Sequence, residues 1–309
     1  MTAPATDWII DNPLWAGAKP RLSVLIPFLG DDPAQLVREL AAQSAEIEIV
    51  LLDDGGKDGD LAARIADTVQ ALPCPTRFVR LAANVGRARG RNRLASEARA
   101  PHLLFLDADM LPDSETFVGD WLAMTVWDAA VAFGGFSFQR TPLDPRFALH
   151  RAMALRSDCL PARQRALSPE KHVFTSNLLV RRDVFEAVAF DEAFTGWGWE
   201  DVEWAMRVAK AWPILHPDIP ASHLGLDTAP ALVAKYRQSA ANFARVVDAH
   251  PQVVSGYASF KVARMIRRLP LRGLLREAAR LAALTEALPS GLRAFAMRLY
   301  RAGLYAEVM

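Results

Sequence analysis

The stretch His102-Leu-Leu-Phe-Leu-Asp-Ala-Asp109 is an apolar run that ends in two aspartates. Strands as apolar as this one are typical of parallel sheets that are covered on both faces. Ligands bind beyond the carboxyl ends of such strands, which is where Asp107 and Asp109 would lie. Carboxylates two residues apart at a strand end can converge on one hard divalent cation, whose charge offsets their repulsion. Two solvated turn aspartates are the alternative interpretation.

Short aliphatic runs alternate with amphipathic stretches through the first two thirds of the chain. This pattern predicts an α/β fold, a parallel sheet with crossover helices. Expected strands cover residues 23–27, 47–52, 77–81, 102–106 and 173–180, with a further apolar run at 129–138. Expected helices cover 31–44, 58–72, 86–99, 114–127, 182–188 and 200–211. Residues 139–172 lack clear periodicity, so we expect a long functional loop with a helical piece.

Length and charge divide the chain into three expected parts. The 309 residues allow one large domain with an appendage, or two domains. We expect an N-terminal extension over 1–20, an α/β domain over 21–225 and a basic, amphipathic helical region over 226–309. The net charge is +1, but residues from 256 onward contribute +7 and the rest of the chain −6. The two parts are therefore expected to meet different surroundings.

Composition excludes several classes of protein. With 51% hydrophobic and 23% charged residues, the chain is neither disordered nor fibrous. Its two cysteines are too few for a disulfide framework or a CxxC metal site. Residues 1–20 lack the parts of a secretory signal peptide, and the longest apolar stretch, 123–138, is interrupted by Asp128 and two glycines. We therefore expect a cytoplasmic protein without a membrane span.

Two more polar clusters follow expected strands. Asp53-Asp54-Gly55-Gly56 comes after 47–52 and is either an ordinary turn or part of a ligand site. The stretch 84–92 sets Gly86 at a helix start beside three arginines, an arrangement that attracts phosphate. A solvated basic helix face is the alternative. The stretch contains no GxGxxG fingerprint, and the chain has no P-loop.

The stretch Gly196-Trp-Gly-Trp-Glu-Asp-Val-Glu203 places two aromatic faces beside carboxylates. This combination suits a sugar ring, although acids at a helix start with tryptophans as core anchors would also explain it. His223 could be a further metal ligand, but a lone histidine is more often structural.

In their order along the chain, these motifs resemble those of the family 2 glycosyltransferases of GT-A fold. The matching residues are Ser23–Pro27, Leu52–Gly55, Asn84, Gly86, Arg91, Asn92, Phe105–Asp109, Ser176, Asn177 and Gly196–Asp201. The last motif is also similar to the W-G-G-E-D of galactosyl- and N-acetylgalactosaminyltransferases and chondroitin-polymerase-type enzymes, with Trp199 in place of the second glycine. The match spans about 21–224, which makes 21–225 a GT-A domain by resemblance.

The resemblance implies a role for each motif. Nucleotide-sugar contacts fall on Pro27, Phe28, Asp53, Asp54, Asn84, Gly86, Arg87, Arg91, Asp107, Ala108 and Asp109. The implied ligands of Mn²⁺ or Mg²⁺ are Asp109, Asp107 and His223. Sugar or acceptor contacts fall on Asn177, Trp197, Gly198 and Trp199. Asp201 would be the general base, and Glu200 would hydrogen-bond sugar hydroxyls.

The implied activity is metal-dependent, inverting transfer of a hexose from a UDP-sugar to a hydroxyl of a glycan or lipid-linked acceptor, in polysaccharide or glycolipid biosynthesis. No nucleic-acid partner is expected. A sugar-1-phosphate nucleotidyltransferase is one alternative, but it normally needs a glycine-rich, arginine-bearing loop where this chain has 28–33. A non-catalytic sugar-binding protein on the same fold is the other alternative.

The helical region is expected to hold helices at 229–250 and 257–288, the second broken at Pro270. Its arginines recur every three or four residues beside leucines, which gives a basic stripe adjoining an apolar one. The leucines could pack on the catalytic domain and leave the arginines in water. Alternatively the helices lie on an anionic membrane, which would place the protein at the inner face of the membrane.

Overall fold

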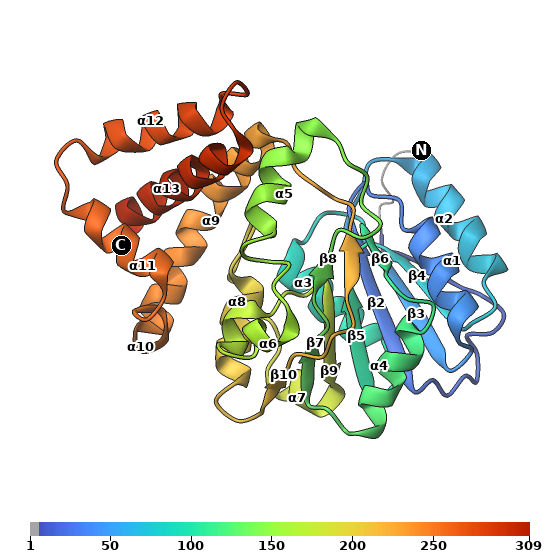
Figure 1. Cartoon of the computed structure of the whole chain (residues 1–309). Coiled ribbons are helices and arrows are strands. Elements are labelled where there is room, and N and C mark those ends of the chain that lie inside the picture. Colours follow the sequence, from blue (N-terminus) through green and yellow to red (C-terminus); the bar gives the residue numbers. More distant parts are fainter. Residues whose placement is uncertain (1–5) are drawn as a thin grey trace.

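The aliphatic runs form one eight-stranded sheet at the centre of the molecule (Figure 1). The computed structural model describes residues 6–309. The strands follow the order β1–β4–β3–β2–β5–β9–β7–β10. Their bounds are β1 (Trp8–Asp11), β2 (Leu22–Phe28), β3 (Ile47–Asp53), β4 (Thr76–Arg80), β5 (His102–Leu106), β7 (Val131–Phe133), β9 (Asn177–Arg181) and β10 (Ile214–Leu215). Every residue of β3 and β5 is buried, as expected of strands covered on both faces.

The sheet is mostly parallel, but β9 runs against both of its neighbours, β5 and β7. The strand expected at 173–180 begins four residues later, at Asn177, and it is an antiparallel member of the expected, mostly parallel sheet. Residues 139–172 leave the sheet at the carboxyl edge and return to the same edge, because Asn177 pairs with Leu106 at the end of β5. Without a crossover to the other edge, β9 has to be antiparallel.

The N-terminal extension is part of the sheet. Strand β1 pairs antiparallel with β4 at the edge of the sheet. Asn12 fixes the extension by donating to the Cys74 carbonyl at 2.8 Å and accepting from the Thr76 N–H at 3.1 Å. Residues 1–5 of the expected extension lie outside the described residues.

Helices cover both faces of the sheet. One face packs against α1 (Ala34–Gln43), α2 (Gly59–Ala71) and α4 (Phe117–Val126), and the other against α3 (Arg87–Glu97), α7 (Arg182–Ala187) and α8 (Glu200–Val208). In β2, Val24 and Ile26 belong to the first core and Leu25 to the second. This alternation is the period of two that a strand imposes on its side chains.

A second sheet of three strands lies beside the carboxyl edge, in the order β6–β11–β8. Its strands are β6 (Met110–Pro112), β8 (Phe136–Ser137) and β11 (Ala221–His223). His223 pairs with Met110 in the antiparallel ladder between β11 and β6. The ladder therefore brings His223 beside Asp109, which directly precedes Met110 in the chain.

The segment 139–172 is more helical than expected. It contains η1 (Pro145–Phe147), α5 (Ala148–Ala154), α6 (Ala162–Arg165) and η2 (Pro169–His172). Each piece is seven residues or shorter, so none shows two full turns of apolar periodicity in the sequence. Proline at the first position of η1 and η2 starts each 3-10 turn.

The C-terminal region is helical throughout, as expected, with the break at Pro270. It consists of α9 (Ala229–Ala249), α10 (Pro251–Val254), α11 (Ala258–Arg267), α12 (Arg272–Leu284) and α13 (Ser290–Val308). These helices share a core with α5 and α8. In addition, the Asn242 side chain on α9 donates to the carbonyls of Thr195 and Gly198, each at 2.9 Å. The region is therefore attached to the turn before α8. Among residues 6–309, no helix is long and apolar enough to cross a membrane.

Removing Arg80 tests how far the carboxyl edge depends on a buried ion pair. Its Nε lies 3.1 Å from Asp53 Oδ2, and both side chains are almost fully buried. We expect Arg80→Ala to lower the free energy of unfolding by about 3–5 kcal/mol, because it leaves a buried carboxylate without its partner. Urea unfolding measures the change.

The matched control is Arg21→Ala, which removes a pair with Glu46 whose two side chains are about half exposed. Such pairs contribute about 0–1 kcal/mol. Equal losses for the two variants would contradict the importance of the buried pair.

Candidate active site

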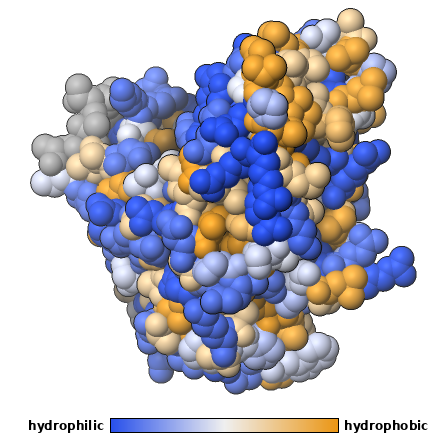
Figure 2. All heavy atoms as spheres, turned by 90° about the vertical axis from the view of Figure 1, so that its left-hand side faces the viewer, coloured by the Kyte–Doolittle hydropathy of each residue, from blue (hydrophilic) through white to orange (hydrophobic). Residues whose placement is uncertain are grey.

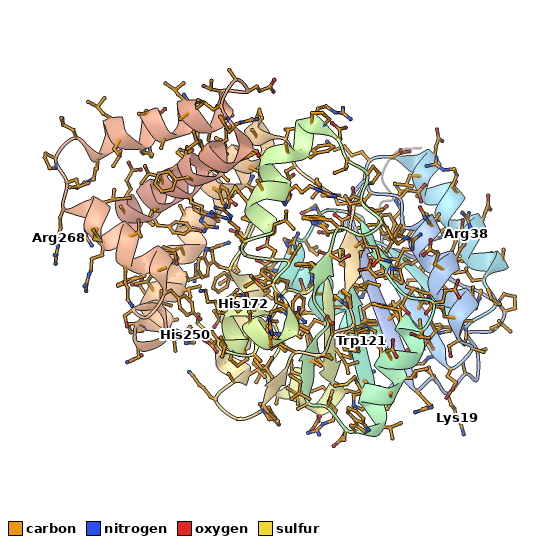
Figure 3. All side chains as sticks on the ribbon, viewed as in Figure 1. Lys19, Arg38, Trp121, His172, His250 and Arg268 are labelled. Carbon is orange, nitrogen blue, oxygen red and sulfur yellow. The ribbon has the colours of Figure 1, made fainter. Side chains whose placement is uncertain are left out.

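A pocket of about 330 Å³ opens at the carboxyl edge of the sheet. Strand ends, segment 139–172, the turn before α8 and helices α9, α11 and α13 supply its walls. Half of the site residues predicted from the sequence line it: Arg87, Asp107, Asp109, Trp197, Gly198, Trp199, Glu200, Asp201 and His223. The other predicted residues are outside its lining: Pro27, Phe28, Asp53, Asp54, Asn84, Gly86, Arg91, Ala108 and Asn177. His172, another lining residue, lies between the sheet and the C-terminal helices (Figure 3).

Asp109 and His223 form the part of the pocket best suited to a cation. His223 Nε2 lies 3.4 Å from Asp109 Oδ2, and the Leu224 N–H donates to the Asp109 carbonyl at 2.8 Å. Burial alone would raise the pKa of Asp109, but the hydrogen bond and charge of His223 hold it below its usual value. No cluster of three ligating side chains occurs among residues 6–309. Carboxylate and imidazole donors nonetheless fit a divalent cation whose remaining ligands come from water and substrate phosphates.

Asp107 faces arginines of α3. Its Oδ1 lies 2.5 Å from Arg91 Nη2, and its Oδ2 lies 3.7 Å from Arg87 Nη2. Arg91 is buried, whereas Arg87 reaches the pocket. The two aspartates of the predicted D-x-D motif therefore have different partners. Asp109 lies near His223, and Asp107 lies near Arg87 and Arg91.

Asp53 and Asp54 are held by protein donors. Asp53 accepts from the Gly56 N–H at 2.7 Å and pairs with Arg80. Asp54 accepts from the N–H groups of Val85 and Gly86 at 2.7 and 3.1 Å, and burial raises its pKa. The two bonds to Asp54 hold the backbone just before α3 and so position Arg87 and Arg91 on that helix. Whether either carboxylate also contacts a nucleotide stays a prediction.

Five other predicted residues lie outside the pocket lining, and most of them are buried. Phe28 is buried and stacks on Phe78 with ring centroids 6.0 Å apart, next to the half-buried Pro27. Asn177 is fully buried and donates to the carbonyls of Gly135 and Ile219. Asn84 is exposed and Ala108 is almost buried.

Glu200 and Asp201 begin α8, and Glu200 shares the Arg87 guanidinium with Asp107. Arg87 Nε lies 2.7 Å from Glu200 Oε1. Burial raises the pKa of Asp201 to about 7, and the neighbouring charge of Glu200 adds to this effect. For Glu200, burial is outweighed by the charges of Arg87 and Arg91, which hold its pKa below the usual value. One carboxyl group is therefore anchored as an anion, while the other can exchange a proton near neutral pH.

Trp197 and Trp199 belong to a strained turn packed on the C-terminal helices. Trp199 has a left-handed backbone, φ 77°, at a position that would favour glycine. Its indole Nε1 donates to the Tyr305 hydroxyl at 3.0 Å and its ring packs on Phe243. Trp197 lies edge-on to Tyr236. Both tryptophans line the pocket and anchor the turn, so the two interpretations of this motif are compatible.

Several pocket residues were not predicted from the sequence. His150 accepts from the Asp227 N–H at 2.7 Å, and burial lowers its pKa to about 4, so it is neutral. Asp227 pairs with Lys235 at 2.6 Å. These residues lie outside any recognisable motif. Gly225 is different, because a Cβ at this position would overlap the carboxylate of Asp109. A glycine two residues after His223 was the available signal.

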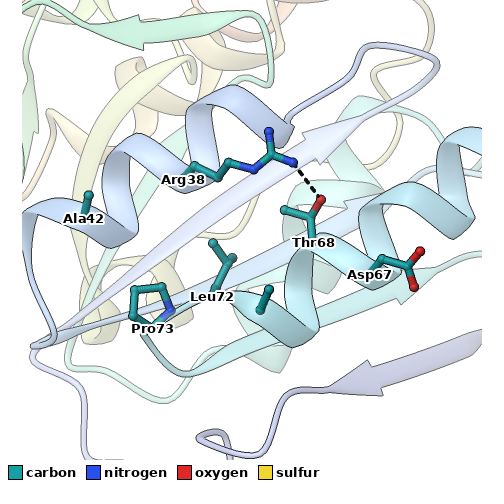
Figure 4. A pocket seen from close by; sticks show the side chains of 7 residues that line it. Arg38, Ala42, Asp67, Thr68, Leu72 and Pro73 are labelled. Carbon is teal, nitrogen blue, oxygen red and sulfur yellow. Dashed lines mark hydrogen bonds between the residues drawn. The ribbon is translucent and has the colours of Figure 1, made fainter.

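A second hollow, of about 500 Å³, lies between α1 and α2 (Figure 4). Arg38 on its rim donates to the Thr68 hydroxyl at 3.3 Å. Its other lining residues are Ala42, Asp67, Ala71, Leu72 and Pro73. With a single carboxylate and no histidine, cysteine or serine, this surface offers no catalytic arrangement.

Comparisons with known proteins show the family and the fold of the chain. The model of the family described as glycosyl transferase family 2 matches residues 23–189, more than half of the chain. The chain belongs to glycosyltransferase family 2. This family 2 enzyme transfers a sugar from a nucleotide-sugar donor. No curated protein matches its sequence.

Solved structures show the fold. A mannosyltransferase from Pyrobaculum calidifontis, in complex with GDP-Man and Mn²⁺, is similar with a TM-score of 0.56 and 15% identity over 94% of this chain and 88% of that one. A 1–349 segment of S. aureus TarS is similar with a TM-score of 0.53 and 16% identity over 91% and 89%. The expected GT-A fold with a C-terminal helical region is thus confirmed for this glycosyltransferase.

Substitution of Gly225 tests whether Asp109 has to stay where it is. We expect Gly225→Ala to lower the transfer rate roughly 10²-fold, because the new methyl group displaces the carboxylate by about an ångström or more. Steady-state kinetics measure the rate, and circular dichroism checks the fold. The control is Gly119→Ala, where an added Cβ meets no atom within 4 Å. An unchanged rate in Gly225→Ala would show that the position of Asp109 is unimportant.

Proposed function

We propose that this glycosyltransferase moves a hexose from a UDP-sugar, with inversion, to a hydroxyl of a glycan or lipid-linked acceptor, in a reaction that needs Mn²⁺ or Mg²⁺. The observation that carries the proposal is the position of Arg87 between Asp107 and Glu200. One guanidinium spans the distance between the carboxylates after β5 and the acid pair of α8. A leaving phosphate and an attacking hydroxyl therefore fit into the same pocket.

In this proposal Asp109 and His223 hold the divalent cation. The cation would neutralise charge on the departing nucleoside diphosphate. Arg87, at the N-terminus of α3, can contact the same phosphates, and the helix start adds its own positive potential. Asp107 would then orient Arg87 and Arg91 rather than bind the cation closely. The Mn²⁺ in the mannosyltransferase neighbour supports a divalent cation at such a site.

Asp201 acts as the general base. Its pKa of about 7 lets it take the proton of the acceptor hydroxyl at neutral pH. Glu200, kept ionised by Arg87, is placed to accept hydrogen bonds from sugar hydroxyls. Attack by a hydroxyl on the face opposite the leaving diphosphate inverts the anomeric centre. Trp197 and Trp199 offer faces for a sugar.

The choice of uridine rests on the resemblance of the motifs, which leaves the identity of the donated sugar open. Asp53 and Asp54 would contribute to binding of the uridine through the loop that they hold. Pro27, Phe28, Asn84 and Gly86 would contribute to the same nucleotide site. The neighbour with GDP-Man carries a different base. A panel of UDP-sugars and GDP-mannose, with release of the nucleoside diphosphate as readout, therefore tests the donor directly. A nucleotidyltransferase would instead release pyrophosphate from UTP and a sugar 1-phosphate, supplied in a separate reaction, and a sugar-binding protein would release nothing in either.

Replacement of Asp201 tests the general base. We expect Asp201→Asn to retain donor binding and lose roughly 10²–10⁴ in kcat. The wild-type rate should rise with pH through about 7, because Asp201 has to lose its proton before it can accept another. Kinetics across pH 5 to 9 measure both, with Asp60→Asn in the first turn of α2 as control. A normal rate in Asp201→Asn would assign the base to another group.

The raised pKa of Asp201 also predicts a stability effect. The folded protein favours the protonated form of Asp201. The contribution of this group to the free energy of unfolding is therefore fully present below 3.8, its pKa in the unfolded chain, and is lost as pH rises through about 7. Asp201→Asn should remove this fall, and unfolding midpoints at pH 6 and pH 8 would reveal it. Parallel pH profiles for the two proteins would contradict the raised pKa.

Thermal shift tests the cation site separately from turnover. We expect a UDP-sugar with Mn²⁺ to raise the melting temperature of the wild type, since a ligand that binds the native state stabilises it. Asp109→Ala should lose the Mn²⁺-dependent part of this rise and keep the fold. Glu115→Ala, an exposed acid on the same stretch, is the control. A full Mn²⁺-dependent shift in Asp109→Ala would remove Asp109 from the cation site.

A further inference from the structure

The C-terminal helices turn large apolar side chains outward. Leu271, directly before α12, is 73% exposed, and Leu274 and Leu281 within the helix are 67% and 57% exposed, whereas Ala279 and Ala283 of α12 are buried. The packing of α12 therefore uses Ala279, Ala283 and, in part, Leu284, and it leaves Leu274 and Leu281 in solvent. This arrangement is the reverse of a helix that only covers a core. The interpretation that these leucines pack on the catalytic domain is wrong for these three.

Neighbouring helices extend the apolar surface. Met265 and Leu269 at the end of α11, and Leu292 and Phe295 in α13, are also exposed. We call these residues, together with Leu271, Leu274 and Leu281, the apolar face. Figure 2 shows hydrophobic spheres gathered at the upper end of the molecule, on the side formed by the C-terminal helices. Exposed apolar patches of this kind mark sites of interaction.

Cations surround the apolar face at the junction of α11 and α12. They are Lys261, Arg264, Arg267, Arg268 and Arg272, all exposed. None of the five forms an ion pair with another residue in 6–309, in contrast to Arg276 and Arg280, which pair with acids. Hydrophilic spheres border the apolar region in Figure 2, and Arg268 marks this end of the molecule in Figure 3.

We propose that the apolar face and its five cations dock this enzyme on the surface of an anionic lipid bilayer. Leucine, methionine and phenylalanine side chains enter the headgroup and acyl boundary, and the arginines and lysine contact anionic headgroups. The five cations favour an anionic bilayer over a second copy of the chain as the binding partner of this face. A second copy of the chain would bring the same five cations together, whereas an anionic bilayer complements them.

Helix α11 connects this surface to the pocket. Tyr257 and Ser259 at its beginning line the pocket, and Arg267 at its end borders the apolar face. Eight residues of α-helix cover about 12 Å. If the proposed function holds, a lipid-anchored acceptor can therefore reach the pocket with its head group while its chains stay in the bilayer.

Vesicle sedimentation tests the docking without any use of transfer activity. The probes are vesicles of phosphatidylglycerol and phosphatidylcholine in equal parts, and of phosphatidylcholine alone. We expect binding to the anionic vesicles that high salt reverses, and little binding to the neutral ones. Equal binding to both, or to neither, would overturn the proposal.

Charge reversal locates the cations. Arg264→Glu, Arg267→Glu and Arg268→Glu together should lower the partition coefficient about a hundredfold or more. The control carries the same change of charge on the other side of the molecule. It combines Lys19→Glu and Arg38→Glu, both labelled in Figure 3, with Arg64→Glu in α2, which Figure 1 shows on that side. It should bind almost as the wild type does, and equal losses in the two triple variants would show that net charge alone attracts the protein.

Apolar substitution locates the inserted side chains. We expect weaker vesicle binding when Leu271→Gln, Leu274→Gln and Leu281→Gln are combined. The control variant, Val126→Gln with Trp127→Gln at the exposed end of α4, should bind as the wild type does.

Sedimentation velocity without lipid tests the rival occupant, a second copy of the chain. A dimer that the leucine variant dissociates, with no vesicle binding, would make the face a homodimer interface. Unchanged thermal shifts with donor and Mn²⁺ in all variants would confirm that the pocket is intact, so failure of docking and failure of the proposed function are distinguishable.

Discussion

The guanidinium group of Arg87 connects parts of the chain that are far apart in sequence. It pairs with Glu200, 113 residues away, and lies near Asp107 at the end of β5. Its own position depends on Asp54, whose carboxylate accepts the backbone N–H groups of Val85 and Gly86 just before α3. Asp54 thus holds the start of α3, and the start of α3 positions Arg87. Arg87 in turn keeps Glu200 ionised. The proton-accepting character of Asp201 follows from this difference between neighbours.

Much of the fold was predictable because the positions of strands and helices follow from short, local sequence patterns. Apolar runs such as 102–106 became strands at the expected residues, and Asp58 caps α2 as a first-turn aspartate should. The direction of β9 was not predictable from periodicity, which is the same for parallel and antiparallel strands. It follows from where segment 139–172 begins and ends, and that is a property of the whole sheet.

The site divides in the same way. Residues next to strand ends and helix starts, such as Asp109 and Asp201, could be placed from sequence because the topology brings those ends together. Asp54 and Asn177 could not be separated from ligand-binding residues, since a motif does not show whether a polar group meets a ligand or a backbone amide. His150 and Lys235 were missed because their position depends on tertiary packing between α5 and α9. Trp199 stands where the similar motif has a glycine, and the structure shows that its indole also links the turn to α13.

That link has a consequence for the order of folding. Trp199 and Tyr305 are separated by 106 residues, and the left-handed backbone at Trp199 is stabilised by contacts made after α13 is in place. A contact of such long range forms late, because the intervening chain loses entropy when its ends meet. During synthesis, the sheet and the catalytic acids can therefore be present on a chain that still lacks a properly shaped turn before α8. The enzyme becomes competent only when its last long helix has been made and packed.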